Sequence, residues 1–304
     1  MSLVALDIGG TKIAARVATA GEGSAATGRT ETPPDGEAAL AAALELVESL
    51  LAEAAADGVD GVGVSFGGQV DARAGVVRRS LHVPGWDGVP LGSLLEDRLD
   101  APARIANDAD AGALGEWHDG GRPPAPVAYV TASTGVGGGI VVDGEILTGA
   151  DGLAGEVGHL IVDPGGARCG CGRRGCVETV ASGPAIARWA GAASAEAVVA
   201  AAARGEPGAR GVLEQAAHAL AVAVSALVAI VDPAFVGIGG GVSLAGPPLW
   251  EPLLAELASL AWPDVNTEVR LAASDESPLR GARVLAERAA ELRTQTIPTG
   301  ERGS

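Results

Sequence analysis

The chain opens on a short apolar run, a pair of glycines and a second apolar run, which predicts a β-hairpin. These three segments are residues 3–8, 9–10 and 13–18. The same order of apolar run, glycine-rich turn and apolar run returns in residues 127–131, 133–139 and 140–142. Two halves that open alike suggest an internal duplication, which would give two similar α/β lobes with a cleft between them.

The remaining pattern predicts further helices and strands. Helices are expected at residues 37–56, 89–99, 109–118, 185–204, 212–231 and 279–292. Strands are expected at 59–66, 103–106 and 234–238. The segment 120–126 is rich in Gly and Pro and is the best candidate for a linker.

Composition narrows the class of protein. The 304 residues carry 21 basic and 38 acidic side chains, a formal charge of −17, which argues against nucleic acid or an anionic membrane as a partner. Asp7 follows an N-terminal segment without basic residues, so no signal peptide is expected. The longest apolar run, 219–231, is too short to span a bilayer and predicts a buried helix. We therefore expect a cytoplasmic protein.

The first candidate for chemistry is the segment Asp7-Ile8-Gly9-Gly10-Thr11-Lys12. Glycine amides can approach phosphate oxygens closely, and the hydroxyl and the ammonium add donors. Lys12 is the only lysine of the chain. The Asp7 carboxylate suits a hydrated Mg²⁺ that also binds phosphate. The alternative is an ordinary hairpin turn.

Two later glycine-rich segments are further candidates for contacts with a nucleotide. Ser133 to Gly139 repeats the hydroxyls and glycines of the first turn. Gly239 to Gly241 follow a predicted strand, where a flat adenine ring could lie against the backbone. A glycine run of this kind also commonly serves packing alone.

Asn107 and Asp108 stand at the end of a predicted strand. A carboxylate there can accept the proton of an attacking alcohol while the amide fixes a neighbouring hydroxyl, as phosphoryl transfer requires. The alternative is a helix N-cap, which both residue types favour.

All three cysteines of the chain gather in one short segment behind a histidine. The four residues are His159, Cys169, Cys171 and Cys176. They match a four-coordinate Cys₃His zinc site, and because no coordination position stays open we expect a structural metal. Glu156 and Glu178 flank this segment and are candidate acceptors for the hydroxyls of a polyol. Solvated surface charge is the alternative for both.

Together these motifs resemble the ROK family of bacterial sugar kinases, and within it the glucokinase-like members. Asp7 to Lys12 resembles its first phosphate motif and Thr134 to Gly139 its second, and Asn107-Asp108 resembles its sugar and catalytic pair. The segment Gly155 to His159, followed by Cys-x-Cys-Gly-x-x-Gly-Cys-x-Glu, resembles the family signature.

The resemblance implies the actin-like ATPase (ribonuclease H-like) fold, with the zinc-clamped loop in its second lobe. The small first lobe would span 1–108, joined by a C-terminal helix at 279–293. The large second lobe would span 109–278. The polar composition of residues 294–304 predicts a disordered tail.

The implied reaction is ATP- and Mg²⁺-dependent phosphorylation of a hexose 6-hydroxyl, glucose first, with Asp108 as the base. Implied sugar contacts come from Gly68, Asn107, Asp108, Glu156, His159 and Glu178. Implied ATP contacts come from Asp7, Gly9, Gly10, Thr11, Lys12, Thr134, Gly135, Gly240 and Gly241. His159 would serve twice, with one ring nitrogen on zinc and the other facing the sugar.

The sequence departs from the family pattern in two places. Ser65-Phe66-Gly67-Gly68-Gln69 replaces the usual Pro-Gly-Pro, and Asp110 stands where Asn is common. Alternative substrates are therefore N-acetylmannosamine, N-acetylglucosamine, mannose or fructose, and polyphosphate is an alternative donor. A non-catalytic sugar sensor is a further alternative, whereas a repressor would need a DNA-binding segment before the first strand. Relatives suggest a homodimer or homotetramer.

Overall fold

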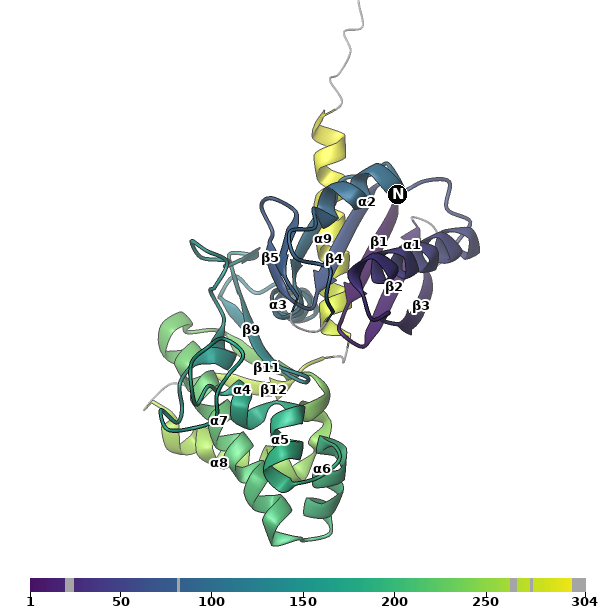
Figure 1. The fold of residues 1–304 in the computed structure, drawn as a ribbon. Coiled ribbons are helices and arrows are strands. Elements are labelled where there is room, and N and C mark those ends of the chain that lie inside the picture. Colours follow the sequence, from purple (N-terminus) through teal and green to yellow (C-terminus); the bar gives the residue numbers. More distant parts are fainter. Residues whose placement is uncertain (20–24, 81–82, 263–266, 274–275, 297–304) are drawn as a thin grey trace, which may run out of the picture. The chain divides into compact units, whose positions relative to one another are not determined.

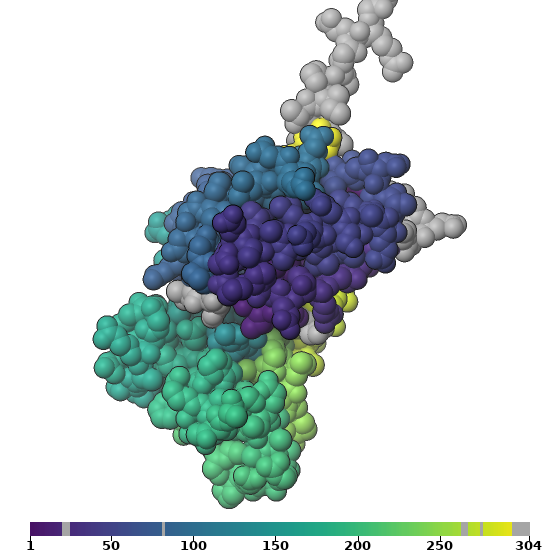
Figure 2. Space-filling view, turned by 45° about the vertical axis from the view of Figure 1, so that its right-hand side comes forward, coloured from purple at the N-terminus to yellow at the C-terminus, as the bar shows by residue number. Residues whose placement is uncertain are grey.

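Two five-stranded sheets organise the computed structural model, which describes residues 1–19, 25–80, 83–262, 267–273 and 276–296. Each sheet belongs to its own compact unit. Unit 1 comprises Met1–His118 with the C-terminal segment from Pro278, and unit 2 comprises Asp119–Ser277. In Figures 1 and 2 most of unit 1 is purple to blue and most of unit 2 is teal to green.

Unit 1 is an α/β unit with a small additional hairpin. Its main strands are β1 (Ser2–Ile8), β2 (Lys12–Thr19), β3 (Ala25–Glu31), β4 (Gly61–Phe66) and β7 (Ala103–Asn107). The small hairpin is formed by β5 (Gln69–Asp71) and β6 (Val76–Arg79). Its helices are α1 (Gly36–Glu53), α2 (Leu91–Leu99), α3 (Asp108–Asp119) and α9 (Ser277–Thr296).

Unit 2 repeats the plan with more helices. Its strands are β8 (Val127–Ala132), β9 (Val136–Val142), β10 (Glu145–Ile146), β11 (Phe235–Gly239) and β12 (Glu268–Leu271). Its α-helices are α4 (Glu178–Ala181), α5 (Gly183–Ala190), α6 (Ala195–Ala203), α7 (Pro207–Val231) and α8 (Pro247–Leu260). The described part of unit 2 also contains the short 3₁₀ helices η1 (Val157–His159) and η2 (Gly241–Ala245).

The two sheets share one topology. Their strand orders are β3-β2-β1-β4-β7 and β10-β9-β8-β11-β12. In each sheet a three-stranded antiparallel part continues into two parallel pairings. The duplication predicted from the two similar hairpins is therefore present in the topology, and the β1–β2 turn corresponds to the β8–β9 turn.

The central strand of unit 1 is buried on both faces, as expected for a sheet covered by helices on each side. Val4, Leu6 and Ile8 belong to the core cluster that includes α1, whereas Leu3 and Ala5 pack with residues of α9. The approach of α9 to the sheet is close, because β4 carries glycine at two of the facing positions. A Cβ built on Gly61 would lie 2.3 Å from the carbonyl oxygen of Ala286.

The long helix α7 forms the centre of the unit 2 core. Its buried residues include Leu213, Leu220 and Leu227, which cluster with strands β8 and β11. By length and composition alone α7 could cross a membrane, but a core helix of a soluble protein passes the same test, so this is weak evidence. The predicted buried helix is confirmed, and it starts at Pro207.

The structure corrects two predicted elements. The helix expected at 185–204 is two helices, because Gly191 takes a φ of 62° that ends α5 and Ser194 caps α6 by accepting a hydrogen bond from the Ala197 amide. The glycine-rich turn expected over 133–139 is shorter, because residues 137–139 pair with β8 inside strand β9.

The boundary between the units also differs from the expected one at residue 108. Helix α3 lies in unit 1, because a Cβ on Gly281 of α9 would meet the carbonyl oxygen of Ala111 at 1.7 Å, so the two helices touch through their backbones. Of the tail expected at 294–304, the first three residues are helical in α9. The rest lies outside the described residues.

The close contact of β4 with α9 gives a testable pair of variants. A Cβ on Gly63 would lie 1.8 Å from the Ala282 carbonyl oxygen, so we expect Gly63→Ala to lower the free energy of unfolding by about 1–3 kcal/mol or more. Exposed Gly58 has no atom within 4 Å of a built Cβ, so Gly58→Ala should leave stability nearly unchanged. Urea denaturation of both variants measures the difference, and equal midpoints would contradict the packing argument.

Candidate active site and metal centre

The candidate residues of unit 1 gather at the carboxyl ends of its parallel strands. Asp7 pairs with Ser65 across β1 and β4, and Phe66 pairs with Asn107 across β4 and β7. Parallel strands bring their carboxyl ends to one edge of a sheet, where α/β proteins place ligand sites. The topology therefore brings Asp7, Gly68 and Asn107-Asp108 to the same edge.

The Asp7 carboxylate has a fixed orientation. Its Oδ1 accepts a hydrogen bond of 2.7 Å from the hydroxyl of Ser65, a side chain that is fully buried. A carboxylate held in this way at a strand end fits the one or two carboxylates that Mg²⁺ prefers when it also binds phosphate. The sequence indicated Asp7 but gave no sign of its partner Ser65.

The β1–β2 turn is closed by backbone contacts. The Gly9 amide donates to the Lys12 carbonyl at 3.0 Å, and Thr32 contacts the turn twice. Its hydroxyl donates to the Gly9 carbonyl at 2.8 Å, and its amide donates to the Thr11 carbonyl at 3.1 Å. Thr11 and Lys12 remain exposed, so their side chains are accessible to a ligand.

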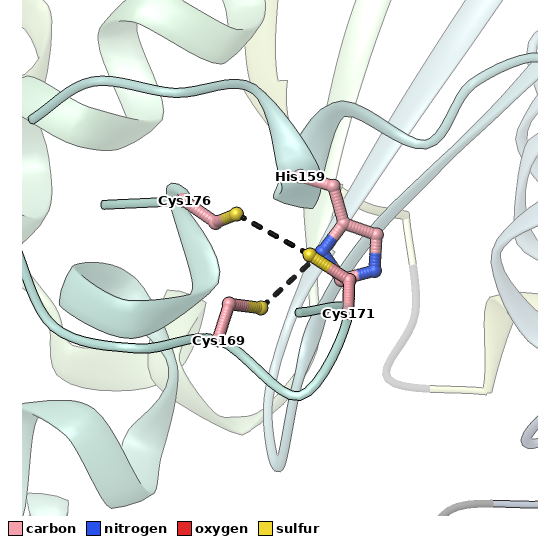
Figure 3. Close-up of side chains that lie close together, drawn as sticks. All are labelled: His159, Cys169, Cys171 and Cys176. Carbon is pink, nitrogen blue, oxygen red and sulfur yellow. Dashed lines mark hydrogen bonds between the residues drawn. The ribbon is translucent and has the colours of Figure 1, made fainter. Parts of the chain in front are cut away.

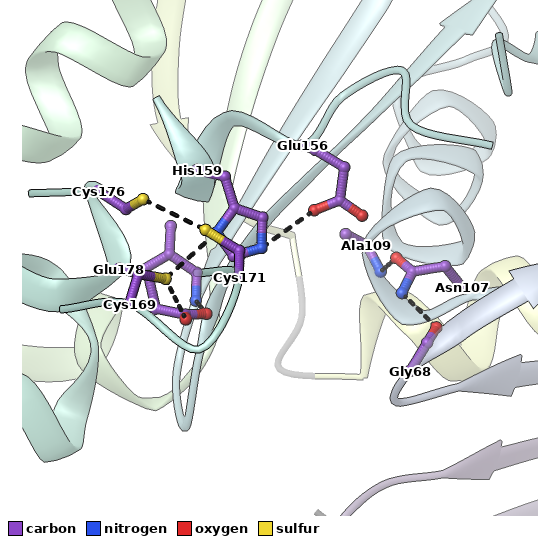
Figure 4. Close-up of polar contacts among 10 residues, drawn as sticks. Gly68, Asn107, Ala109, Glu156, His159, Cys169, Cys171, Cys176 and Glu178 are labelled. Atoms are coloured by element: carbon purple, nitrogen blue, oxygen red, sulfur yellow. Dashed lines mark hydrogen bonds and ion pairs between the residues drawn. The ribbon is translucent and has the colours of Figure 1, made fainter. Parts of the chain in front are cut away.

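Two interpretations were possible for Asn107-Asp108, a helix N-cap and a substrate-binding pair, and the contacts of Asn107 are compatible with both. Its Oδ1 accepts the Ala109 amide at 2.9 Å, which is the capping role, and its Nδ2 donates to the Gly68 carbonyl at 2.9 Å. The first residue of α3 is Asp108, whose Oδ1 also accepts the Ala109 amide at 2.9 Å. The two hydrogen bonds of Asn107, which the right-hand part of Figure 4 shows, join Gly68 in the loop after β4 to Ala109 near the start of α3.

In unit 2 the β8–β9 turn borders a cavity of about 740 Å³. Thr134 and Gly241, both predicted to contact ATP, line it together with residues of α5, α6 and η2. Gly135 and Gly240 are not among the lining residues. Gly240 has a φ of +85°, and its Cβ would meet the Ala132 carbonyl oxygen at 2.4 Å, so this glycine allows η2 to approach β8.

The segment that carries Glu156 and His159 lies directly on strand β9. A Cβ on Gly158 would lie 1.8 Å from the Val136 carbonyl oxygen, and a Cβ on Gly155, which has a φ of +84°, would lie 2.5 Å from the Gly138 carbonyl oxygen. No side chain fits at either position. The glycines of this segment therefore fix the backbone from which Glu156 and His159 project.

His159, Cys169, Cys171 and Cys176 point toward one another (Figure 3), and one ligand atom from each lies within 4.8 Å of all the others. The Sγ atoms of Cys171 and Cys176 are 3.6 Å apart, and Cys169 Sγ is 3.6 Å from His159 Nδ1. Tetrahedral zinc with Zn–S distances of about 2.3 Å places its sulfur ligands about 3.8 Å apart, so the donor set and its spacing fit that ion. The cluster predicted from the cysteine spacing is therefore assembled in the structure.

The second ring nitrogen of His159 has its own partner. Nε2 lies 3.8 Å from Oε2 of Glu156, so the imidazole stands between the thiols and a carboxylate (Figure 4). A carboxylate behind a ligating imidazole helps to orient the ring. Burial raises the pKa of Glu156 against the opposing effect of His159, and nearby Glu178 raises it further.

Glu178 lies between the metal cluster and the β8–β9 turn. Its Oε2 accepts the Val136 amide at 3.2 Å. Its Oε1 lies 3.6 Å from Cys169 Sγ, which can donate a hydrogen bond to it only as a thiol and not as a zinc-bound thiolate. The predicted sugar contacts of unit 2 (Glu156, His159 and Glu178) are thus grouped around one cluster. Ser65, Thr32 and the apolar cavity lining were missed by the sequence analysis, because a buried serine, a loop threonine and alanine-rich helices carry no distinctive pattern.

Comparisons with known proteins point to one family. The sequence matches the ROK family over residues 3–289. A glucokinase of Thermotoga maritima is 36% identical over 251 residues, covering 75% of this chain and 79% of that protein. An N-acetylmannosamine kinase of Yersinia pseudotuberculosis is 39% identical over 249 residues, covering 80% and 83%. The solved structure of a ROK family glucokinase from Streptomyces griseus, in complex with glucose and AMPPNP, is 30% identical with a TM-score of 0.79, covering 95% of this chain and 100% of that one.

The metal centre can be tested directly. We expect about one zinc per chain by elemental analysis, since one Cys₃His set binds one ion. Cys176 is fully buried in the cluster, so Cys176→Ser should lose the zinc and lower the melting temperature. Arg168→Ala, at an exposed position of the same loop, serves as the control and should keep both. Purified protein without zinc, or a Cys176→Ser variant that retains it, would contradict the assignment.

Proposed function

The chain belongs to the ROK family and is an ATP-dependent sugar kinase, and from this premise we propose that it transfers the γ-phosphoryl group of ATP to the 6-hydroxyl of a hexose, with glucose as the first substrate. The names of its relatives support the class of reaction, and the ligands of the Streptomyces griseus structure support glucose and ATP. N-acetylmannosamine is the second candidate, on the strength of the Yersinia relative.

The cavity beside the β8–β9 turn is the observation that carries the nucleotide part of the proposal. Its apolar walls come from α5, α6 and η2 and suit a nucleoside, while Ser133 and Thr134 at its edge offer hydroxyls to phosphates. In unit 1 the β1–β2 turn would supply further donors from Gly9, Gly10, Thr11 and Lys12. Asp7, oriented by Ser65, would hold Mg²⁺, which neutralises charge on the phosphates during transfer.

Asp108 is the proposed base. Phosphoryl transfer passes through a loose transition state, so the base needs the right position more than a shifted pKa. The position of Asp108 is set by the strand that ends at Asn107, by the helix that begins at Asp108 and by the hydrogen bond from Asn107 to the Gly68 carbonyl. Its carboxylate would accept the proton of the sugar hydroxyl as the oxygen attacks the γ-phosphorus.

The sugar contacts that the family resemblance implies are Gly68, Asn107, Asp108, Glu156, His159 and Glu178, and we propose them as sugar ligands. Carboxylates accept hydrogen bonds from sugar hydroxyls, and the Cys₃His cluster would keep the side chains of Glu156, His159 and Glu178 in place when zinc is bound. The cytoplasmic location stays a prediction from the sequence, and a homodimer or homotetramer stays a prediction from the family resemblance. The charge of −17 supports the expectation that neither nucleic acid nor membrane is a partner.

The substrate is tested by ADP release from Mg-ATP across a panel of hexoses and N-acetylhexosamines. We expect the highest kcat/KM with glucose. A preference for another sugar would keep the kinase and change its substrate. No turnover with any sugar, from folded and zinc-loaded protein, would overturn the proposal in favour of a sugar sensor.

The base is tested by Asp108→Asn. We expect kcat to fall by about 10²–10⁴-fold, the usual contribution of general base catalysis, while glucose binding measured by calorimetry largely persists. Asp119→Asn, at the last residue of the same helix, is the control and should retain activity. Loss of sugar binding together with turnover would show that Asp108 is chiefly a sugar ligand or a structural residue.

The proposal that nucleotide binds in the cavity beside the β8–β9 turn is tested by placing a large side chain in that cavity. Ala200 lines the cavity from α6 and is exposed, so Ala200→Trp should raise the KM for ATP at least about tenfold through steric exclusion, with a smaller effect on the KM for sugar. Ala197→Trp, exposed on the same helix but outside the lining, is the matched control. Equal KM values for ATP in the two variants would place the nucleotide elsewhere.

A further inference from the structure

The carboxylate of Glu178 contacts two parts of unit 2: the β8–β9 turn, which is expected to bind phosphate, and the Cys₃His cluster, which is expected to bind zinc. Oε2 accepts the amide of Val136, the first residue of β9 directly after the β8–β9 turn, at 3.2 Å. Oε1 lies 3.6 Å from Sγ of Cys169 in the metal cluster (Figure 4). One side chain thus spans the distance between the turn and the cluster. When zinc is bound, the Cys169 thiolate has no proton to donate, so the link from the cluster to Glu178 then runs through the backbone from Cys176. Its implied role as a sugar contact does not account for this placement.

The turn is shaped to receive this carboxylate. The Ser133 amide donates to the Gly135 carbonyl at 2.8 Å, and the Gly183 amide donates to the Ser133 carbonyl at 2.8 Å, so the first part of the turn is closed by backbone. The amide that follows, Val136, is satisfied by Glu178. A Cβ on Gly135 would lie 2.8 Å from Oε2, so the carboxylate occupies the space that a side chain there would need.

The backbone of Glu178 is fixed from the cluster side. Thr179 donates its hydroxyl to the Cys176 carbonyl at 2.7 Å. The Thr179 carbonyl accepts hydrogen bonds of 3.0 Å from the side chains of both Arg188 and Trp189 on α5. Cys176, a candidate metal ligand, is only two residues before Glu178, so a metal that fixes Cys176 also fixes the start of α4.

We propose that Glu178 is a positioning residue that couples the Cys₃His cluster to the β8–β9 turn, so that metal in the cluster determines the order of the turn and its affinity for nucleotide. The part that concerns nucleotide rests on the proposed function, whereas the coupling to the turn does not. Without metal, the glycine-rich loop from His159 to Cys176 loses its cross-link and gains conformational freedom. The carboxylate then no longer has one fixed place from which to accept the Val136 amide.

The first experiment follows amide hydrogen exchange in residues 133–136, which needs no ligand. We expect slow exchange in zinc-loaded protein and at least about fivefold faster exchange in Glu178→Ala, the lower end for coupled sites. Chelator-treated wild type should show the same increase. Glu178→Gln keeps an acceptor oxygen and should restore most of the protection. Glu214→Ala, an exposed carboxylate on α7, is the control for the loss of one charge and should match wild type.

Elemental analysis and circular dichroism accompany these measurements. The coupling requires that Glu178→Ala keeps its zinc and its helices while the turn alone exchanges faster. Unchanged exchange in zinc-loaded Glu178→Ala would overturn the proposal. Removal of zinc that accelerates exchange equally in Glu178→Ala and in Glu214→Ala would also overturn it, because the metal would then act on the turn without Glu178. If the chelated chain unfolds, the zinc-loaded Ala and Gln variants decide the question by themselves.

The second experiment measures the dissociation constant of a non-hydrolysable ATP analogue by calorimetry, without sugar, so that a sugar contact of Glu178 contributes nothing. We expect weaker binding by at least about fivefold in Glu178→Ala, recovery in Glu178→Gln, and no further loss in Glu178→Ala on chelation. An affinity that is insensitive to Glu178 would overturn the link to nucleotide. Absence of binding by zinc-loaded wild type would contradict the proposed donor instead, while amide exchange would still decide the role of Glu178.

Discussion

The restraint that most of the candidate site depends on is the cross-link between His159 and the three cysteines. From the end of β10 to the start of α5, the described chain holds only the three-residue η1 and the four-residue α4. Glycine loses more conformational freedom on ordering than any other residue, and this segment is rich in it. A cluster that joins His159 near the start of the loop to Cys176 near its end shortens the chain that must be ordered, and it does so next to Glu156 and Glu178.

In unit 1 the backbone that carries the candidate residues is ordered by regular secondary structure and not by a metal cross-link. Its candidate residues stand at the ends of strands β1, β4 and β7, whose ladders already fix the backbone. Short hydrogen bonds then set the side chains, from Ser65 to Asp7 and from Asn107 to the Gly68 carbonyl. The two units share a topology and differ in what orders their functional residues: regular structure in unit 1 and a cross-linked loop in unit 2. A duplicated fold can therefore carry functional residues that are held in place in two different ways.

Those parts of the fold and of the site could be predicted from the sequence for which one physical cause produces a recognisable pattern. The two hairpins, the buried helix α7 and the cysteine cluster each follow from hydrophobic periodicity or from ligand spacing. Elements without such a pattern were missed. Strand β3 is largely polar and exposed because it lies at the edge of its sheet, and α8 contains Pro252. The helix break at Gly191 was overlooked because alanine-rich sequence on both sides favours a helix.

The contacts of single polar side chains were the least predictable part of the site. Nothing in the sequence indicates that Ser65 orients Asp7 or that Glu178 accepts the Val136 amide, because both contacts join segments more than forty residues apart. Gly135 illustrates the difficulty. Its place in a glycine-rich run suggests a ligand that needs room, yet the atom nearest to its missing side chain is Oε2 of Glu178. In the sequence, a glycine that leaves room for a neighbouring carboxylate cannot be distinguished from a glycine that leaves room for a phosphate. Here the contact with the Glu178 carboxylate would order the turn so that it can bind the phosphates of the nucleotide.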